Sequence, residues 1–171
     1  MDMNREERND QFLTYSLGKE IFALDISSVR EVLELTPVTE IPRTPEFMCG
    51  VINLRGHAVP VVDMRQKLGM SKAESTVNTC IIIVEVQFGG EPTIMGAMVD
   101  SVREVFEMSQ SAIEPAPHLG TAISADYIEG MGRQGDQFII IVDISKVFSE
   151  EELAMTHVTG EPGCEVSALA T

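Results

Sequence analysis

Short apolar runs separated by turn-forming residues dominate the chain. Their length, β-branched residues and partial alternation of apolar and polar positions are typical of strands. Turn sequences such as Gly18-Lys19-Glu20 and Arg55-Gly56-His57 lie between neighbouring runs and favour antiparallel hairpins. The runs are 11–17, 21–24, 29–35, 51–54, 58–62, 79–86, 93–99, 102–108, 127–131 and 137–142. The sequence therefore predicts a mainly β protein.

Only short helices are predicted. Asp63 and Asp143 each precede a stretch of one or two helical turns, MRQKLG and ISKVF, in the position of an N-cap residue. A capping-box spacing that begins at Ser149 predicts a final helix through about Met155. Three prolines make residues 37–46 an extended connection, because proline disfavours the helical conformation in its neighbourhood.

The chain contains an internal repeat. Three segments recur: VREVLE (29–34) as VREVFE (102–107), FALDISS (22–28) as GAMVDS (96–101), and VVDMRQKL (61–68) as IVDISKVF (141–148). The same series of short strands and a capped helix is therefore predicted twice. Closure of each series into a small barrel would remove unpaired edges, and a groove between two such barrels is a common place for binding.

Composition excludes several classes of partner. The 171 residues carry a formal net charge of -15, which disfavours phosphate backbones and anionic lipid surfaces. Aromatic residues make up 5% and Trp is absent, so there is no stripe for base stacking. The N-terminal residues lack the apolar core of a signal peptide, and no apolar run approaches the ~20 residues of a membrane helix. We expect no nucleic-acid binding and no membrane insertion.

Motifs for chemistry are missing from the sequence. The cysteines Cys49, Cys80 and Cys164 are far apart and lack metal-ligand spacing, so we expect free thiols in a reducing cytosol. No phosphate-binding loop, nucleophile elbow or zinc motif occurs, and the histidines are isolated. The sequence predicts a protein that is not an enzyme and that has no metal and no cofactor.

Two sequence features keep alternative interpretations open. The ten Met residues fit either core filling or an adaptable docking groove. Arg55, in the segment NLRG between apolar strands, is either a solvated residue beside a turn or a partner of Glu31 that presents a polar anchor in an apolar patch.

Long segments resemble one family. IPRTPEFMCGVINLRGHAVPVVDMRQKLG (41–69) closely resembles the signature of the CheW family of bacterial chemotaxis coupling proteins. Residues 11–34 resemble the start of that domain, and IEPAP (113–117), YIEGMG (127–132) and FIIIVDISKVF (138–148) resemble its second half. The resemblance covers about residues 10–155.

The resemblance implies an architecture and a set of partners. The family fold is two five-stranded, SH3-like β-barrels around a shared core. We expect the first barrel at about 10–72 with parts of the C-terminal segment, the second at about 76–148, and flexible termini at 1–9 and 157–171. Family members are non-enzymatic scaffolds that couple the cytoplasmic tips of methyl-accepting chemotaxis receptors to the regulatory domain of the CheA histidine kinase. A cytoplasmic location at membrane receptor arrays, with other CheW copies in rings, is also implied.

The resemblance also implies two sets of site residues. The receptor-binding residues would be Val29, Glu31, Asn53, Leu54, Arg55, Cys80, Ile81, Gly96 and Val105. The kinase-binding residues would be Val38 and Ala58 on the first barrel, and Glu114 and Leu119 on the second. Three positions depart from the family pattern and leave the partner's identity open: Cys49, His57 and Glu114.

Other functions stay open at this stage. The chain could serve a chemosensory pathway that governs surface motility or polymer secretion instead of flagella. A CheV-like protein needs a receiver domain, for which 171 residues leave no room. A small β-barrel ligand-binding module is the alternative from a different class.

Overall fold

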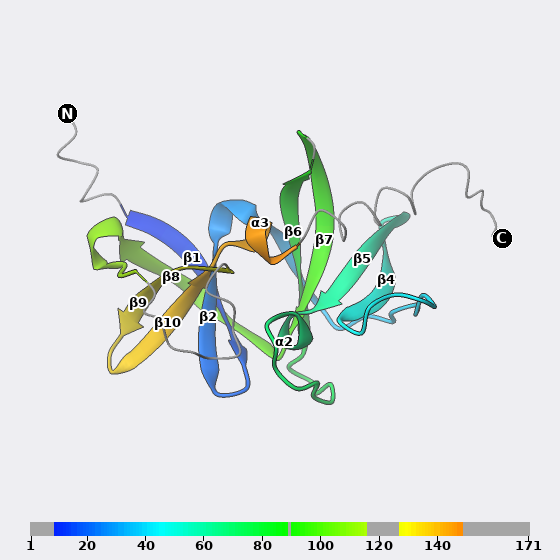
Figure 1. Ribbon diagram of the computed structural model, residues 1–171, viewed down its shortest axis with the longest axis horizontal. Coiled ribbons are helices and arrows are strands. Elements are labelled where there is room, and N and C mark those ends of the chain that lie inside the picture. Colours follow the sequence, from blue (N-terminus) through cyan, green and yellow to red (C-terminus); the bar gives the residue numbers. More distant parts are fainter. Residues whose placement is uncertain (1–8, 89, 116–126, 149–171) are drawn as a thin grey trace.

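The computed structural model describes residues 9–88, 90–115 and 127–148, and these residues form a mainly β protein (Figure 1). Each predicted strand is present, with its ends shifted by at most a few residues. The strands are β1 (Asn9–Leu17), β2 (Glu20–Asp25), β3 (Val29–Glu34), β4 (Met48–Leu54), β5 (His57–Asp63), β6 (Cys80–Phe88), β7 (Glu91–Val99), β8 (Ser101–Ser109), β9 (Ile128–Gln134) and β10 (Gln137–Val142). Short helical turns are η1 (Ile26–Ser28), α2 (Met64–Lys67), η2 (Gln110–Ala112) and α3 (Ile144–Val147).

The strands form two five-stranded sheets. Sheet A has the order β8-β1-β2-β10-β9, and sheet B has the order β3-β6-β7-β5-β4. Neighbours are antiparallel except for one parallel pair in each sheet, β2 with β10 and β5 with β7. The predicted fold class, two five-stranded SH3-like units with short helices, is confirmed.

The two edges of each sheet are linked locally rather than by a full ladder. In sheet B, Thr39 follows β3 and exchanges two backbone hydrogen bonds with Val51 of β4, at 2.8 and 2.9 Å. In sheet A, Glu114 follows β8 and exchanges bonds of 2.8 and 2.7 Å with Met131 of β9. Close approach is permitted by Gly50, where a Cβ would overlap the Thr39 carbonyl. Each sheet therefore curls toward a barrel and stays open along most of its edge.

The sheets do not follow the two halves of the chain. This differs from the prediction of a first barrel at about 10–72 with parts of the C-terminal segment and a second at about 76–148. Sheet A combines β1 and β2 of the first repeat with β8, β9 and β10 of the second, and sheet B combines the remaining strands. Replacing each strand by its repeat partner (β1 by β6, β2 by β7, and so on) converts one strand order into the other. The hairpins β1–β2 and β6–β7 are therefore exchanged between two equivalent sheets.

The buried side chains of the described residues form three clusters, one within each sheet and one between the sheets. The cluster between the sheets contains Tyr15 and Phe22 of sheet A, whose rings stack at 5.8 Å, and Ile82 and Met95 of sheet B. The shared core implied by the family resemblance is thus present. Sheet A has its own cluster around Ile139. Sheet B has a corresponding cluster with Ile81, Val61 and Ile52.

The predicted helix caps are confirmed. The Asp63 carboxylate accepts a hydrogen bond from Arg65 N at 3.0 Å, and that of Asp143 accepts one from Ser145 N at 3.1 Å. The predicted final helix at 149–155 and the terminus 157–171 lie outside the described residues, as do residues 1–8 of the other predicted terminus. Among the described residues, the helices lack the length and apolarity needed to cross a membrane.

Candidate docking surface

Glu31 and Arg55 lie at opposite edges of sheet B, and they meet. Glu31 belongs to edge strand β3, and Arg55 follows edge strand β4. Their side chains form two parallel contacts, Arg55 Nη1 to Glu31 Oε2 and Arg55 Nη2 to Glu31 Oε1, each 2.8 Å long. Of the two interpretations open for Arg55, the structure supports the partner of Glu31.

The segment NLRG builds the turn that presents Arg55. Arg55 has φ +52 and Gly56 has φ +86, so both adopt left-handed backbone conformations, as required in a tight two-residue hairpin turn. The Asn53 side-chain oxygen accepts a hydrogen bond from Gly56 N at 2.8 Å, which fixes the turn. Asn53 therefore acts on the turn geometry, and the turn directs Arg55 toward β3.

The ion pair is open to solvent. The side chains of Arg55 and Glu31 are 68% and 29% exposed. The hydrogen bond from Arg55 lowers the pKa of Glu31, and the same bond raises the pKa of Arg55. Both groups are therefore charged at neutral pH. Exposed pairs contribute little to stability, so the consequence of this pair is geometric: it links the two edges of sheet B.

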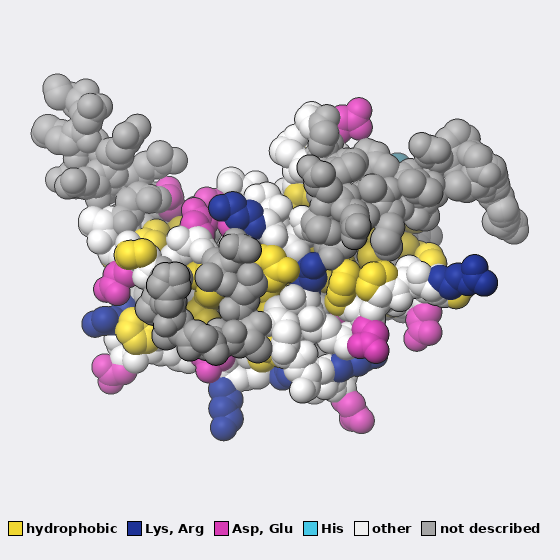
Figure 2. All heavy atoms as spheres, viewed as in Figure 1, with side chains coloured by type: hydrophobic (Ala, Val, Ile, Leu, Met, Phe, Trp, Pro, Cys, Tyr) yellow, Lys and Arg dark blue, Asp and Glu magenta, His cyan; other side chains and the backbone are white. Residues whose placement is uncertain are grey.

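Each of the two edges that the ion pair joins also carries an apolar residue. Val29 is half-buried against the shared core, and Leu54 is half-buried against the sheet B cluster. We call Val29, Glu31, Asn53, Leu54 and Arg55 the edge surface. It combines a fixed pair of charges with two apolar contacts. On the face of the molecule drawn in Figure 2, apolar side chains are likewise interspersed with acidic and basic ones.

Three other predicted receptor residues lie beneath or beside the edge surface. Ile81 is fully buried, opposite Leu33 of β3. Gly96 is buried in β7, and a Cβ there would lie 3.0 Å from Ile81 Cγ2 and 3.2 Å from Val61 Cγ2. Cys80 is half-buried at the start of β6. Ile81 and Gly96 thus support the surface from the core instead of belonging to it.

Val105 lies on the other sheet. It is 50% exposed on β8 of sheet A, in register with Leu13 of the shared core. Its side chain therefore points to the side of sheet A that faces sheet B. Its distance from the edge surface depends on how the two sheets are set against each other.

The predicted kinase residues occupy the outer parts of both sheets. Val38 is half-buried against the sheet B cluster, and Ala58 is exposed on β5. Ala58 lines a hollow of about 240 Å³ together with Thr39, Val51 and His57. In sheet A, Glu114 is exposed, and its carboxylate lies 3.9 Å from Arg133 Nη2. Leu119 lies outside the described residues.

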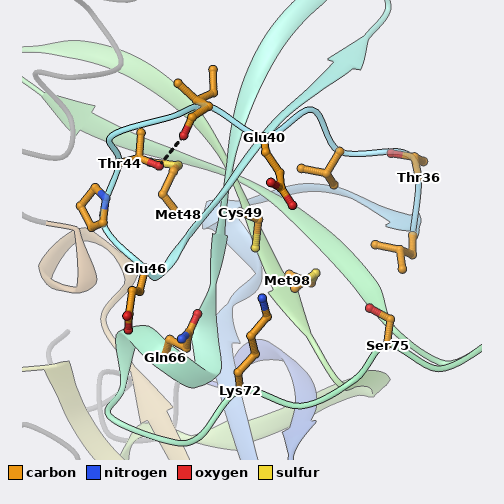
Figure 3. A pocket seen from close by; sticks show the side chains of 14 residues that line it. Thr36, Glu40, Thr44, Glu46, Met48, Cys49, Gln66, Lys72, Ser75 and Met98 are labelled. Atoms are coloured by element: carbon orange, nitrogen blue, oxygen red, sulfur yellow. Dashed lines mark hydrogen bonds between the residues drawn. The ribbon is translucent and has the colours of Figure 1, made fainter.

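Sequence reasoning missed a larger cavity on sheet B. A hollow of about 520 Å³ is bounded by the connection after β3, by β4 and by the segment after α2. In Figure 3 the side chains of Glu40 and Lys72 point into it, toward Cys49 and Met98. Burial raises the pKa of the Cys49 thiol to about 11. No local motif marks this cavity, because its walls come from several separate segments, among them α2 with Gln66 and β7 with Met98.

Outward-facing residues on sheet A form a second feature without a sequence signal. The Arg133 guanidinium lies 5.0 Å from the centre of the Phe138 ring, which is 46% exposed. Phe138 occupies the place in sheet A that Ala58 occupies in sheet B, because each is the second residue of the later hairpin strand. We call the end of sheet B at Ala58 and the end of sheet A at Phe138 the outer ends. They are equivalent in backbone position and differ in side chains.

A model of the CheW-like domain matches residues 11–152. The chain belongs to the CheW family. It is 36% identical to the chemotaxis protein CheW of Klebsiella aerogenes over 150 residues, which is 88% of each chain. It is 31% identical to the Treponema pallidum protein of the same name, over 84% of each chain.

A solved structure supports the CheW fold. The scaffolding protein TtCheW from Thermoanaerobacter tengcongensis is 36% identical, and the match covers 85% of this chain and 96% of that one with a TM-score of 0.75. The predicted family and the predicted role as a coupling adaptor in chemotaxis signalling are confirmed.

Proposed function

We propose that this CheW-family protein couples the cytoplasmic tips of chemotaxis receptors to the CheA histidine kinase through the edge surface of sheet B. The observation that carries the proposal is the bidentate pair of Glu31 and Arg55, which joins the two edges that carry half-buried Val29 and Leu54. An amphipathic helix can place an apolar face against such side chains, while the fixed charges select its orientation.

The mode of action is binding without chemistry. The pair of Glu31 and Arg55 satisfies its own charges, so neither group is available as a strong acid or base near neutral pH. No group of three or more His, Cys, Asp and Glu that could hold a metal occurs in the part of the chain that the structure describes. We propose a scaffold that has no enzymatic activity and needs no cofactor, located in the cytoplasm at receptor arrays.

Kinase contacts are assigned to the two outer ends. On sheet B, Val38 and Ala58 flank the bridge between Thr39 and Val51. On sheet A, Glu114 belongs to the equivalent bridge. Because the two sheets share one strand order, the two ends offer related backbone surfaces, which suits end-to-end pairing with a homologous domain or with further copies of this protein.

The repeat supplies a matched control for the test. Glu104 of β8 corresponds to Glu31 of β3 in the VREV segments. We expect Glu31→Ala and Arg55→Ala to lose co-sedimentation with receptor signalling fragments and to retain binding to CheA. Glu104→Ala should retain both. Equal loss with the Glu104 variant, or loss of CheA binding alone, would contradict the assignment of the receptor to the edge surface.

A further inference from the structure

Between its described strands, the chain passes from one sheet to the other at two places. The first passage is η1, which leads from β2 of sheet A to β3 of sheet B. The second is Asp100, which leads from β7 of sheet B to β8 of sheet A. These passages are equivalent in the repeat, since each immediately precedes a VREV strand. The relative setting of the sheets therefore depends on the geometry at these two points and on the packing of the shared core.

Asp100 is held by groups from both sheets. Its carboxylate accepts hydrogen bonds from Arg65 Nε at 2.8 and 3.0 Å and from Arg65 Nη2 at 2.8 Å. It also accepts one from Gly18 N, in the β1–β2 turn of sheet A, at 2.7 Å. Arg65 belongs to α2, which follows β5 of sheet B. The three segments come together on one side of the molecule (Figure 1).

Further contacts surround this group of residues. Arg65 Nη1 donates to the Ser71 carbonyl at 2.9 Å, so all three guanidinium nitrogens donate hydrogen bonds. Asp100 N donates to the Ser16 carbonyl at 3.2 Å. The side chains of Arg65 and Asp100 are 18% and 31% exposed, so the pair is more shielded from solvent than the pair of Glu31 and Arg55. We call Arg65, Asp100 and Gly18 the passage clamp.

The other passage has no equivalent ion pair. Aligned on the repeat, Arg65 corresponds to Ser145 and Asp100 corresponds to Ser27. Two serines cannot form a charged bidentate contact. Sheet A and sheet B nevertheless have the same strand order. The strand order of a sheet therefore does not require such an ion pair. The role of the clamp must lie in a property that distinguishes the second passage from the first.

The second passage leads into the sheet that lies apart from the edge surface. Val105 is located five positions after Asp100 on β8, whereas the other receptor residues predicted from the family are on sheet B. The outer ends that carry Ala58 and Glu114 also belong to different sheets. A surface assembled from two sheets functions only when the angle between the sheets is fixed.

We infer that Arg65 and Asp100 are positioning residues, which set the orientation of sheet A relative to sheet B and thereby couple receptor binding to kinase control. That the clamp sets the orientation of the sheets is inferred from its contacts. That this orientation couples receptor binding to kinase control rests on the proposed function. Apart from Val105, each assigned contact lies on one sheet: the edge surface on sheet B, and one kinase contact at the end of each sheet. The affinity of a single contact should therefore depend little on the clamp. Transmission between partners requires both sheets in one arrangement.

The first measurement concerns orientation alone. Residual dipolar couplings of backbone amides are fitted separately for sheets A and B. We expect a single alignment tensor for both sheets in the wild-type protein and two different tensors in Arg65→Met, which keeps much of the aliphatic stem and loses the donors. Arg65→Lys should be intermediate, and Ser145→Ala, at the equivalent place in the repeat, should match the wild type. Asp100→Asn takes the place of Arg65→Met if that variant fails to fold. A single tensor in the folded clamp variant would overturn the inference.

The second measurement concerns coupling. In a reconstituted assembly of receptor fragments, CheA and this protein, we expect kinase control to fall roughly tenfold in Arg65→Met, within the usual range of coupling between sites. Binding to each partner alone should change less than about twofold. If Arg65→Met shows two alignment tensors but unchanged kinase control, the inferred link between sheet orientation and coupling is overturned. Failure of the wild-type protein to bind either partner would refute the proposed function instead, while the dipolar couplings still decide the orientation.

Discussion

Glu31 and Arg55 join the two edge strands of one sheet, and each satisfies the other's charge. Two contacts of 2.8 Å link them, and backbone bonds between Thr39 and Val51 link the same two edges. The pair can therefore act in two ways. A partner can contact the two charges directly. Alternatively, the pair can hold the NLRG turn against β3 and so fix the positions of Val29 and Leu54 for a partner.

A charge exchange separates these two roles. The double variant Glu31→Arg with Arg55→Glu retains an intramolecular pair and inverts the charges that a partner meets. We expect each single variant and the double variant to lose receptor binding, because the fixed charges orient the receptor helix. The double variant should recover the wild-type thermal midpoint. Recovery of receptor binding by the double variant would show that the pair acts only as a structural link.

The sequence predicted the strands well, because the β-branched runs and turn residues are local signals. It could not predict how the strands are shared between sheets. The hairpins β1–β2 and β6–β7 have the same apolar pattern, so their exchange leaves every local preference unchanged. The packing of the shared core, such as that of Tyr15 and Phe22 with Ile82 and Met95, belongs to the observed arrangement, and such contacts are invisible in a single sequence.

The site was predicted in part. NLRG marked a turn between apolar strands, and the proximity of Arg55 to Glu31 followed from that interpretation. The burial of Ile81 could not be foreseen, since CIIIVEV is apolar on both faces and has no polar alternation to mark the exposed one. Arg65 and Asp100 carried one signal that was available, namely that both are replaced by serine in the other repeat.

Gly96 offers a test of support from beneath the surface. A Cβ at this position would lie 3.0 Å from Ile81 Cγ2, 3.2 Å from Val61 Cγ2 and 3.4 Å from the Pro60 carbonyl. Gly96→Val would overpack this point of sheet B, and we expect it to destabilise the protein by about 1–3 kcal/mol in urea unfolding. Receptor binding at a temperature where the variant is folded should weaken less than it does in Arg55→Ala. A fully stable Gly96→Val that fails to bind receptor would instead place Gly96 in the contact.

Tyr15 and Thr14 are adjacent and should respond in opposite directions. The Tyr15 hydroxyl is buried without a hydrogen-bond partner among the described residues, and burial raises its pKa. Tyr15→Phe removes an unsatisfied polar group and should raise the free energy of unfolding by about 1 kcal/mol.

Thr14 provides the contrast. Its hydroxyl donates to the Glu104 carbonyl at 2.6 Å and accepts from Glu104 N at 3.1 Å, at the bulge where the ladder between β1 and β8 shifts register. Thr14→Val keeps the shape and leaves both backbone groups without this partner, so it should cost about 1–2 kcal/mol. Urea unfolding of the two variants side by side is the measurement. A stability loss in Tyr15→Phe would indicate that the hydroxyl has a partner, such as a buried water.

The Cys49 thiol should react slowly at neutral pH. Burial raises its pKa to about 11, with the nearby Asp63 carboxylate acting in the same direction and the Lys72 ammonium opposing it. The thiolate is the reactive form, so at pH 8 only roughly one Cys49 side chain in a thousand is ready to react. The rate of alkylation by iodoacetamide, followed at the Cys49 peptide by mass spectrometry, should rise about tenfold per pH unit up to about pH 10.

Two controls make the Cys49 result decisive. In urea, the same peptide should react with the ordinary thiol pKa of about 8.5, because the surrounding cavity is lost. Lys72→Met should slow the reaction of the folded protein further, because it removes the cation that lowers the pKa of Cys49. Figure 3 shows the Lys72 side chain pointing toward Cys49. A rate that levels off near pH 9 in the folded protein would show that the cavity opens often enough to expose Cys49, and would refute its burial as the controlling factor.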